Sequence, residues 1–127
     1  FVGGIARSQS IRRICIFNNL SNEAFTSIMR ALPSVSQLEQ LIIGESNNVG
    51  PDGWSHLGFL LGSGVCKLKK FHLYRNNYMG NEGVDVLSNG LRGIGSSLKE
   101  LVLEDNSIDS EGLSTLVEAL QTCTGLE

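Results

Sequence analysis

Two stretches of this sequence repeat each other 30 residues apart: LKKFHLYRN, which runs from Leu68 to Asn76, and LKELVLEDN, which runs from Leu98 to Asn106. Two stretches upstream, IRRICIFNN and LEQLIIGES, keep the same spacing of large apolar residues. The repeats succeed one another after 27, 30, 30 and 28 residues, and they begin at Ile11, Leu38, Leu68, Leu98 and Leu126. Self-similarity at such a period predicts a stack of like structural units.

The first half of each unit has the pattern of a short β-strand. Large apolar residues stand at its first, fourth and sixth positions: Ile11/Ile14/Ile16, Leu38/Leu41/Ile43, Leu68/Phe71/Leu73 and Leu98/Leu101/Leu103. Because alternate side chains of a strand point to the same side, the fourth and sixth positions predict one buried face. An amide placed just after a strand can hydrogen bond the backbone of a sharp turn. The ninth positions are therefore predicted to form a structural turn ladder of Asn19, Ser46, Asn76 and Asn106.

The second half of each unit has helical spacing. A residue suited to N-capping comes first, namely Ser21, Gly50, Gly80 or Asp109, and an acid follows two residues later. Apolar residues then recur on one helical face as the pairs Ile28/Leu32, Leu57/Leu61, Leu87/Leu91 and Leu116/Leu120. Gly62 and Gly93, just past two of these pairs, are expected to end their helices. Each unit is thus predicted as a strand, a turn and a helix of about three turns.

No such unit can bury its apolar face alone, so the units are expected to share one core in a single domain over residues 1–127. Its repeats fall at about 11–37, 38–67, 68–97 and 98–125. Residues 1–10 have the pattern of the helix end of a preceding repeat, and residues 126–127 that of the start of the next. We expect both ends to be uncapped, which makes association through the repeat ends possible.

Four units of the form LxxLxLxxN, each followed by a small residue and xxxLxxxL, resemble leucine-rich repeats of the ribonuclease-inhibitor type. The resemblance covers about residues 11–126, with Ser46 in place of one turn asparagine. It implies a right-handed α/β horseshoe segment, with a parallel sheet on the concave face and helices on the convex face. It also implies a non-enzymatic scaffold that binds a protein partner. The alternative is a regulatory domain similar to the GTPase-activating protein of Ran, and a purely structural role in a longer receptor or adaptor also stays open.

Composition narrows the classes of function. The chain has 127 residues, a formal net charge of −3 and no apolar run long enough to span a membrane, so we expect no membrane partner. Its three cysteines lack the close spacing of a zinc site, and they are interpreted as reduced thiols of a cytoplasmic protein. Its two histidines belong to no catalytic or metal-binding motif. We therefore predict no catalytic residues, no metal and no cofactor.

The basic stretch KLKKFHLYR, residues 67–75, raises the question of nucleic-acid binding. In a parallel stack, the column of Lys70 contains Glu100, and the column of Arg75 contains Glu45 and Asp105. These acids are expected to lie beside the two cations and to compensate much of their charge. We therefore predict no nucleic-acid partner.

A protein partner is expected on the exposed columns of the sheet. One column reads Cys15, Ile42, His72, Val102 and the next reads Phe17, Gly44, Tyr74, Glu104. Aromatic and β-branched residues also suit a strand whichever way they face, so strand propensity is the plainer interpretation. The sharper hypothesis is a patch with aromatic anchors and a charged rim, as in interface hot spots. Its predicted partner-binding residues are Arg13, Phe17, Ile42, Lys70, His72, Tyr74, Arg75, Val102, Glu104 and Asp105.

Overall fold

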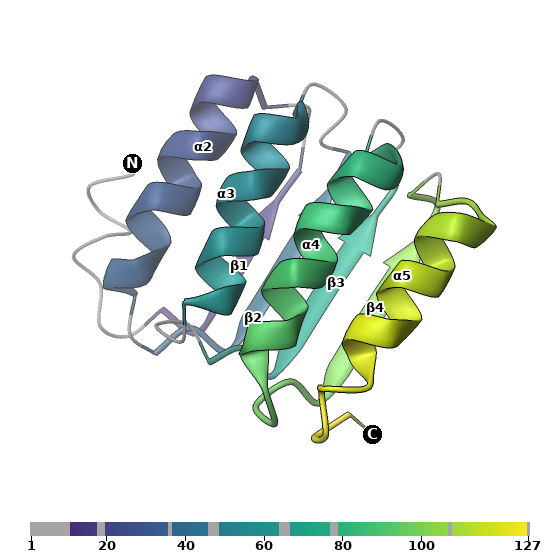
Figure 1. Cartoon of the computed structure of the whole chain (residues 1–127). Coiled ribbons are helices and arrows are strands. Elements are labelled where there is room, and N and C mark those ends of the chain that lie inside the picture. Colours follow the sequence, from purple (N-terminus) through teal and green to yellow (C-terminus); the bar gives the residue numbers. More distant parts are fainter. Residues whose placement is uncertain are drawn as a thin grey trace.

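The computed structural model describes residues 11–17, 20–35, 37–45, 49–63, 67–76, 79–106 and 108–126. Strands and helices alternate along the chain, and in Figure 1 the helices form one layer in front of the strands. The strands are β1 (Arg13–Ile16), β2 (Gln40–Gly44), β3 (Lys70–Tyr74) and β4 (Glu100–Glu104). The helices are α2 (Asn22–Ala31), α3 (Pro51–Gly62), α4 (Gly80–Ile94) and α5 (Ser110–Leu120), with a short 3-10 helix, η1 (Leu32–Ser34), after α2.

The strands form one parallel sheet in the order β1-β2-β3-β4. Arg13 pairs with Gln40, Gln40 with Lys70, and Lys70 with Glu100, so every strand keeps the register expected from the repeat. Parallel neighbours in chain order require a crossover between them, and each crossover here contains a helix. The predicted α/β solenoid segment is confirmed.

The core lies between the sheet and the helix layer. It contains the fourth- and sixth-position residues of the inner strands and the apolar pairs of the helices. Leu41, Ile43, Phe71, Leu73, Leu57, Leu61, Leu87 and Leu91 are all fully buried. Trp54 at the start of α3 is also buried, and its ring lies 5.3 Å from that of Phe25 in the preceding unit. Since each such side chain contributes about 1.5–3 kcal/mol on burial, stacking of the units stabilises the fold.

Two helix starts have the predicted side-chain cap. Ser21 Oγ accepts a hydrogen bond from the Ala24 N–H at 3.1 Å, and Asp109 Oδ1 accepts one from the Gly112 N–H at 3.0 Å. Both bonds satisfy an N–H group that has no partner within the helix.

The prediction for α4 was wrong at both ends. Gly80 is the first residue of that helix and Met79 is its cap, because the Met79 carbonyl already accepts the first helical hydrogen bond, from the Gly83 N–H at 3.1 Å. Gly93 does not end the helix either. The helix continues to Ile94 and stops at Gly95, whose φ of 68° is one that only glycine adopts readily.

Helices α3 and α4 approach each other closely through glycines. A Cβ added to Gly58 would lie 2.4 Å from the Val86 carbonyl oxygen, and one added to Gly90 would lie 2.4 Å from the Gly58 carbonyl oxygen. The two backbones are thus in direct contact there. Any side chain at either glycine would push the helices apart.

Candidate functional site

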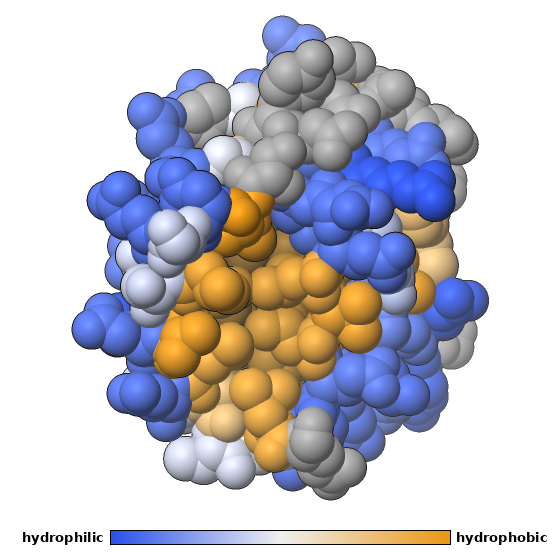
Figure 2. Space-filling view, turned by 90° about the vertical axis from the view of Figure 1, so that its right-hand side faces the viewer, coloured by the Kyte–Doolittle hydropathy of each residue, from blue (hydrophilic) through white to orange (hydrophobic). Residues whose placement is uncertain are grey.

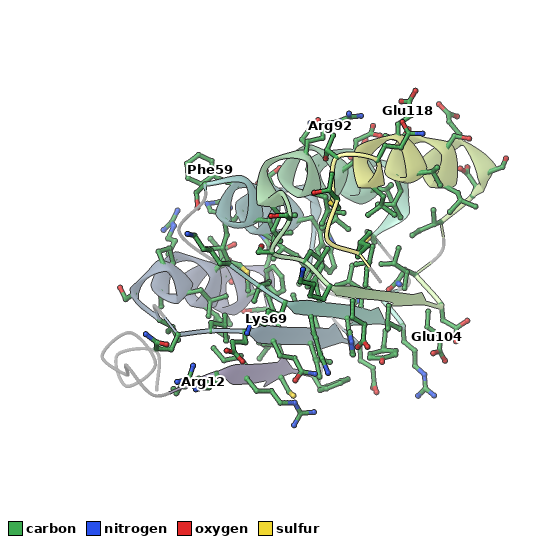
Figure 3. The ribbon with its side chains drawn as sticks, turned by 90° about the horizontal axis from the view of Figure 1, so that it is seen from below. Arg12, Phe59, Lys69, Arg92, Glu104 and Glu118 are labelled. Carbon is green, nitrogen blue, oxygen red and sulfur yellow. The ribbon has the colours of Figure 1, made fainter. Side chains whose placement is uncertain are left out.

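The face of the sheet turned away from the helices, here called the open sheet face, carries the residues predicted to bind a partner. Figure 3 shows the helix layer on one side of the strands and a row of side chains projecting from the other side. The register places Cys15, Ile42, His72 and Val102 in one column, and Gly44, Tyr74 and Glu104 in the next. These are the columns expected from the repeat spacing.

Phe17 packs against Gly44 of the next strand. It follows the last residue of β1, and it is 38% exposed. A Cβ added to Gly44 on β2 would lie 2.2 Å from Phe17 Cε1 and 2.6 Å from Cδ1, closer than carbon atoms can approach. The ring therefore occupies the space that a side chain at position 44 would need.

His72, Tyr74 and Glu100 form a hydrogen-bonded cluster on the same face. His72 Nε2 lies 2.5 Å from Glu100 Oε2, and Tyr74 Oη lies 3.3 Å from His72 Nδ1. The two rings meet edge to face at 5.8 Å. An ionised carboxylate only accepts, so Nε2 carries a proton and, in the neutral ring, Nδ1 accepts from the tyrosine hydroxyl. Both aromatic side chains are partly buried, and these contacts tie them to each other and to Glu100.

The expectation that Ile42 is exposed was wrong. It is only 6% exposed, although it lies on the open sheet face. It stands on a central strand between Cys15 and His72, so a strand on each side limits its contact with water. Val102, in the same column, is half-buried on the edge strand. The aromatic surface available to a partner is therefore that of Phe17, His72 and Tyr74.

The five charged residues predicted for the rim, Arg13, Lys70, Arg75, Glu104 and Asp105, are all exposed. The pairing of charges differs from the expectation. Glu100 turns to His72 instead of Lys70, while Arg12 and Lys69 pair with Glu39 at 3.6 and 3.3 Å. A half-buried imidazole needs a partner more than a lysine that stays hydrated, which explains the choice. The compensation expected at Lys70 is therefore weaker.

A left-handed backbone position follows β2, β3 and β4, and the repeat pattern alone did not predict it. Glu45, Arg75 and Asp105 have φ of 53°, 55° and 56°. The Glu45 N–H donates to the Tyr74 carbonyl at 3.0 Å, and the Arg75 N–H donates to the Glu104 carbonyl at 2.8 Å. This turn projects the charged side chains at the carboxyl end of the sheet.

The turn asparagines are buried at this end of the sheet and hydrogen bond the backbone of the preceding unit. Asn76 and Asn106 are 0% and 4% exposed. Asn76 Nδ2 donates to the Ile43 carbonyl, and Asn106 Nδ2 donates to the Leu73 carbonyl, so each amide bonds the strand of the preceding unit. Asn106 Oδ1 in turn accepts from the Asn76 N–H at 3.1 Å and from Asn76 Nδ2 at 3.0 Å. Asn19 and Ser46 lie outside the described residues.

Phe59 is an exposed aromatic residue that the sequence reasoning missed. It is 80% exposed on α3, on the opposite side of the molecule from the open sheet face (Figure 3). It borders a hollow of about 420 Å³ toward Met29 of α2 and another of about 380 Å³ toward Val86 of α4. In the sequence, Phe59 does not belong to the apolar pair of its helix, Leu57/Leu61, and this was the signal that could have indicated its exposure.

In the described part of the chain, no group of three or more His, Cys, Asp or Glu side chains is placed to hold a metal ion. Among the described helices, none combines the length and the hydropathy that a membrane crossing requires.

Comparison with known families identifies one unit directly. Residues 96–117, which contain β4 and most of α5, match the family model described as Leucine Rich repeat. The chain contains a leucine-rich repeat. The three preceding strands share the register and the apolar spacing of this repeat. A search of curated proteins gave no match. Leucine-rich repeats are generally interaction modules that bind proteins.

Proposed function

We propose that the chain binds a protein partner through its open sheet face and has no enzymatic activity of its own. The observation that supports this is the aromatic surface of Phe17, which is 38% exposed, beside the partly buried His72 and Tyr74, on a sheet where polar side chains would be usual. Aromatic side chains bury large areas in an interface, and their fixed orientation here lowers the entropy cost of binding.

The surrounding charges suit this role. The basic residues belong to β1 and β3: Arg13 begins β1, Lys70 begins β3 and Arg75 follows β3. The acidic residues Glu104 and Asp105 lie at the end of β4. Charges at the rim of an interface act mainly on the association rate and on its salt dependence. We propose that Ile42 and Val102 complete the apolar floor between these charges, and that Ile42 contributes little contact area because it is only 6% exposed.

We also propose a cytoplasmic location and a ribonuclease-inhibitor-type repeat. The free thiols of Cys15 and Cys123 favour a reducing compartment. A helix in every crossover between strands favours that type of repeat. Glu39 forms ion pairs with both Arg12 and Lys69. These ion pairs weaken the attraction of the two cations for phosphate, which disfavours a nucleic-acid partner.

The test is a binding measurement with a purified partner, identified first by cross-linking to the chain. Phe17→Ala and Tyr74→Ala are each expected to weaken binding by about 2 kcal/mol, or roughly 30-fold in Kd. Gly44→Ala should also weaken it. That change removes no exposed side chain, but its methyl group would displace the Phe17 ring.

Phe59→Ala is the matched control, because it removes the same side chain from the helical side of the molecule. Glu118→Ala tests a charge on that side, which Figure 3 shows on α5. Both variants should bind as the parent chain does. Loss of binding in Phe59→Ala, with Phe17→Ala and Tyr74→Ala unaffected, would place the interface on the helices and refute the proposal.

A further inference from the structure

The charged residues of the molecule are divided between its two ends along the strands. In Figure 1 the strands run upward and the helices run downward, so the strand starts and the helix ends lie together at the lower end. Among the described residues, this lower end has the acids Glu39, Glu100 and Glu118 and eight cations, here called the basic end: Arg12, Arg13, Arg30, Lys67, Lys69, Lys70, Arg92 and Lys99. The described part of the upper end has one cation, Arg75, and nine acids: Glu23, Glu45, Asp52, Glu82, Asp85, Glu104, Asp105, Asp109 and Glu111.

The two ends therefore carry opposite charge. The surface beside β4 and α5, which Figure 2 shows, instead has a broad hydrophobic centre with hydrophilic residues along its margins. The charges thus gather at the ends of the strands and not at the end of the stack.

Helix stability explains part of this division. Acids in the first turn and bases in the last turn complement the helix dipole, as Glu23 and Arg30 do in α2 and as Glu82 and Arg92 do in α4. Sheets have little net dipole, yet the residues at and just before the strand starts are also mostly basic. They comprise the acids Glu39 and Glu100 and the cations Arg12, Arg13, Lys67, Lys69, Lys70 and Lys99. The cations beside the sheet need another explanation.

Two lysines at the strand starts stand directly beside each other. The Lys99 N–H donates to the Lys69 carbonyl at 2.8 Å, and in the same column the Lys69 N–H donates to the Glu39 carbonyl at 2.8 Å. Both lysines are exposed, as is the adjoining Lys70. Like charges at opposite positions of neighbouring strands destabilise a sheet, so this arrangement does not serve the stability of the fold.

The acids beside these lysines are already engaged. Glu39 Oε1 lies 3.6 Å from Arg12 Nη1 and 3.3 Å from Lys69 Nζ, so one carboxylate is shared between two cations. Glu100 turns to His72 on the open sheet face. Several cations of the strand starts therefore form no ion pair within the described part of the chain, namely Arg13, Lys67, Lys70 and Lys99.

We propose that the basic end binds an acidic segment of a protein, a run of Asp or Glu side chains that lies across the starts of the strands. Neighbouring strands are about 4.8 Å apart, so the four strand starts span about 14 Å, which about four or five residues of extended chain can cover. Carboxylates placed there pair with Lys70 and Lys99 and relieve the repulsion between Lys69 and Lys99. This contact does not require Phe17 or Tyr74, so it is distinct from the interface proposed above.

The distribution of acids favours a short protein segment over a nucleic acid. A long polyanion extends beyond the basic end, where the acids of the upper end and the net charge of −3 repel it. Glu39 and Glu100 also interrupt the row of cations, which weakens its attraction for a continuous line of phosphates. A short acidic segment contacts the basic end alone.

The probe for the test is a fluorescein-labelled peptide of six glutamates, with a peptide of six glutamines as the blank. Binding to the 127-residue chain is measured by fluorescence anisotropy at low ionic strength, where charge pairs are least screened. Lys99→Gln should weaken binding about threefold to fivefold. Glu39→Gln should strengthen it by a similar factor, because it releases Arg12 and Lys69.

Arg75→Gln is the matched control, since it removes one cation from the upper end and should leave the Kd of the peptide unchanged. Phe17→Ala should also leave it unchanged, and loss of binding there would move the peptide to the open sheet face and overturn the proposal. Equal weakening by Lys99→Gln and Arg75→Gln would overturn it as well, because net charge alone would then explain the binding. Circular dichroism of each variant verifies that the fold is retained.

Two further measurements cover the other occupants. Tighter binding of an oligothymidylate with six phosphates than of the peptide would assign the basic end to a nucleic acid and overturn the proposal. Sedimentation equilibrium of the chain alone tests for a second copy. Association at low ionic strength that Lys99→Gln abolishes would place the acidic upper end of another molecule on the basic end, and this too would overturn the proposal.

Discussion

Replacement of Asn106 by alanine is the sharpest test of what holds consecutive units together. The amide of Asn106 makes three hydrogen bonds with the preceding unit: Oδ1 accepts from the Asn76 N–H and from Asn76 Nδ2, and Nδ2 donates to the Leu73 carbonyl. Alanine would remove all three. Asn76 Nδ2 keeps its bond to Ile43, so the groups that lose their amide partner are the Asn76 N–H and the Leu73 carbonyl.

The cost follows from the three lost bonds. A hydrogen bond contributes about 0.5–1.5 kcal/mol net, so Asn106→Ala should destabilise the fold by about 1.5–4.5 kcal/mol. A domain of this size has about 5–15 kcal/mol of stability in total. The variant should therefore lose a large share of its stability. Asn106→Asp keeps an acceptor for Asn76 but sets a second oxygen against the Leu73 carbonyl in a buried site, so it should not restore the stability of the parent chain.

Urea unfolding, followed by far-UV circular dichroism and by the fluorescence of the buried Trp54, measures the loss. Coincidence of the two curves checks that the units unfold together. Asn89→Ala is the matched control, because this asparagine is exposed on α4, and its change should stay within about 0.5 kcal/mol. Equal midpoints for Asn106→Ala and Asn89→Ala would refute the account of the ladder.

Three further predictions concern single residues. Arg75→Gly should raise the free energy of unfolding, measured by urea denaturation, by about 0.5–1 kcal/mol. Glycine adopts the left-handed φ of 55° without strain, and the greater entropy of the unfolded glycine chain cancels part of that gain. The pKa of Asp109 is lowered by the hydrogen bond that its carboxylate accepts from the Gly112 N–H, and by that from Asn81. The ionised carboxylate therefore stabilises the fold fully above the ordinary carboxyl pKa, and this stabilisation is lost as the pH falls through the lowered pKa. Asp109→Asn should therefore flatten the acid limb of a plot of stability against pH. Burial raises the pKa of Cys123, so iodoacetamide should label it far more slowly than exposed Cys15, as read by peptide mass spectrometry.

Each of these has a result that contradicts it. Arg92→Gly, within α4, should cost about 1 kcal/mol, and an equal loss in Arg75→Gly would show that φ at position 75 carries no strain. An acid limb unchanged in Asp109→Asn would assign the pH dependence to other carboxylates. Labelling of Cys123 at the rate of Cys15 would mean that the end of the stack opens readily.

The repeat spacing predicted the sheet well, for a local reason. Residues such as Leu41, Phe71 and Leu101 recur at a fixed offset, and a parallel ladder between like units can only pair equal offsets. The columns of the open sheet face follow from the same rule. The caps at Ser21 and Asp109 were also predictable, because a cap depends on residues within one turn of the helix.

The exposure of side chains on the open sheet face, and the choice of partner for Glu100, depended on contacts between units. The spacing of residues along the sequence does not specify these contacts. Ile42 has the pattern of an exposed strand residue, yet its neighbours shield it. Glu100 had two possible partners in reach, and the half-buried ring of His72 decided between them. Phe17 lies over Gly44 only because the register brings a residue without a side chain beside it.

The sequence by itself determined the number, order and register of the strands, because apolar periodicity specifies which face each residue buries. The tertiary structure decided which of the outward residues remain accessible. Leu113 and Val84 illustrate the difference, since both stand at the same position of a unit and only Val84 has a further unit packed over it. Burial is a property of what packs against a residue, so residues in equal sequence positions can differ from fully buried to half exposed.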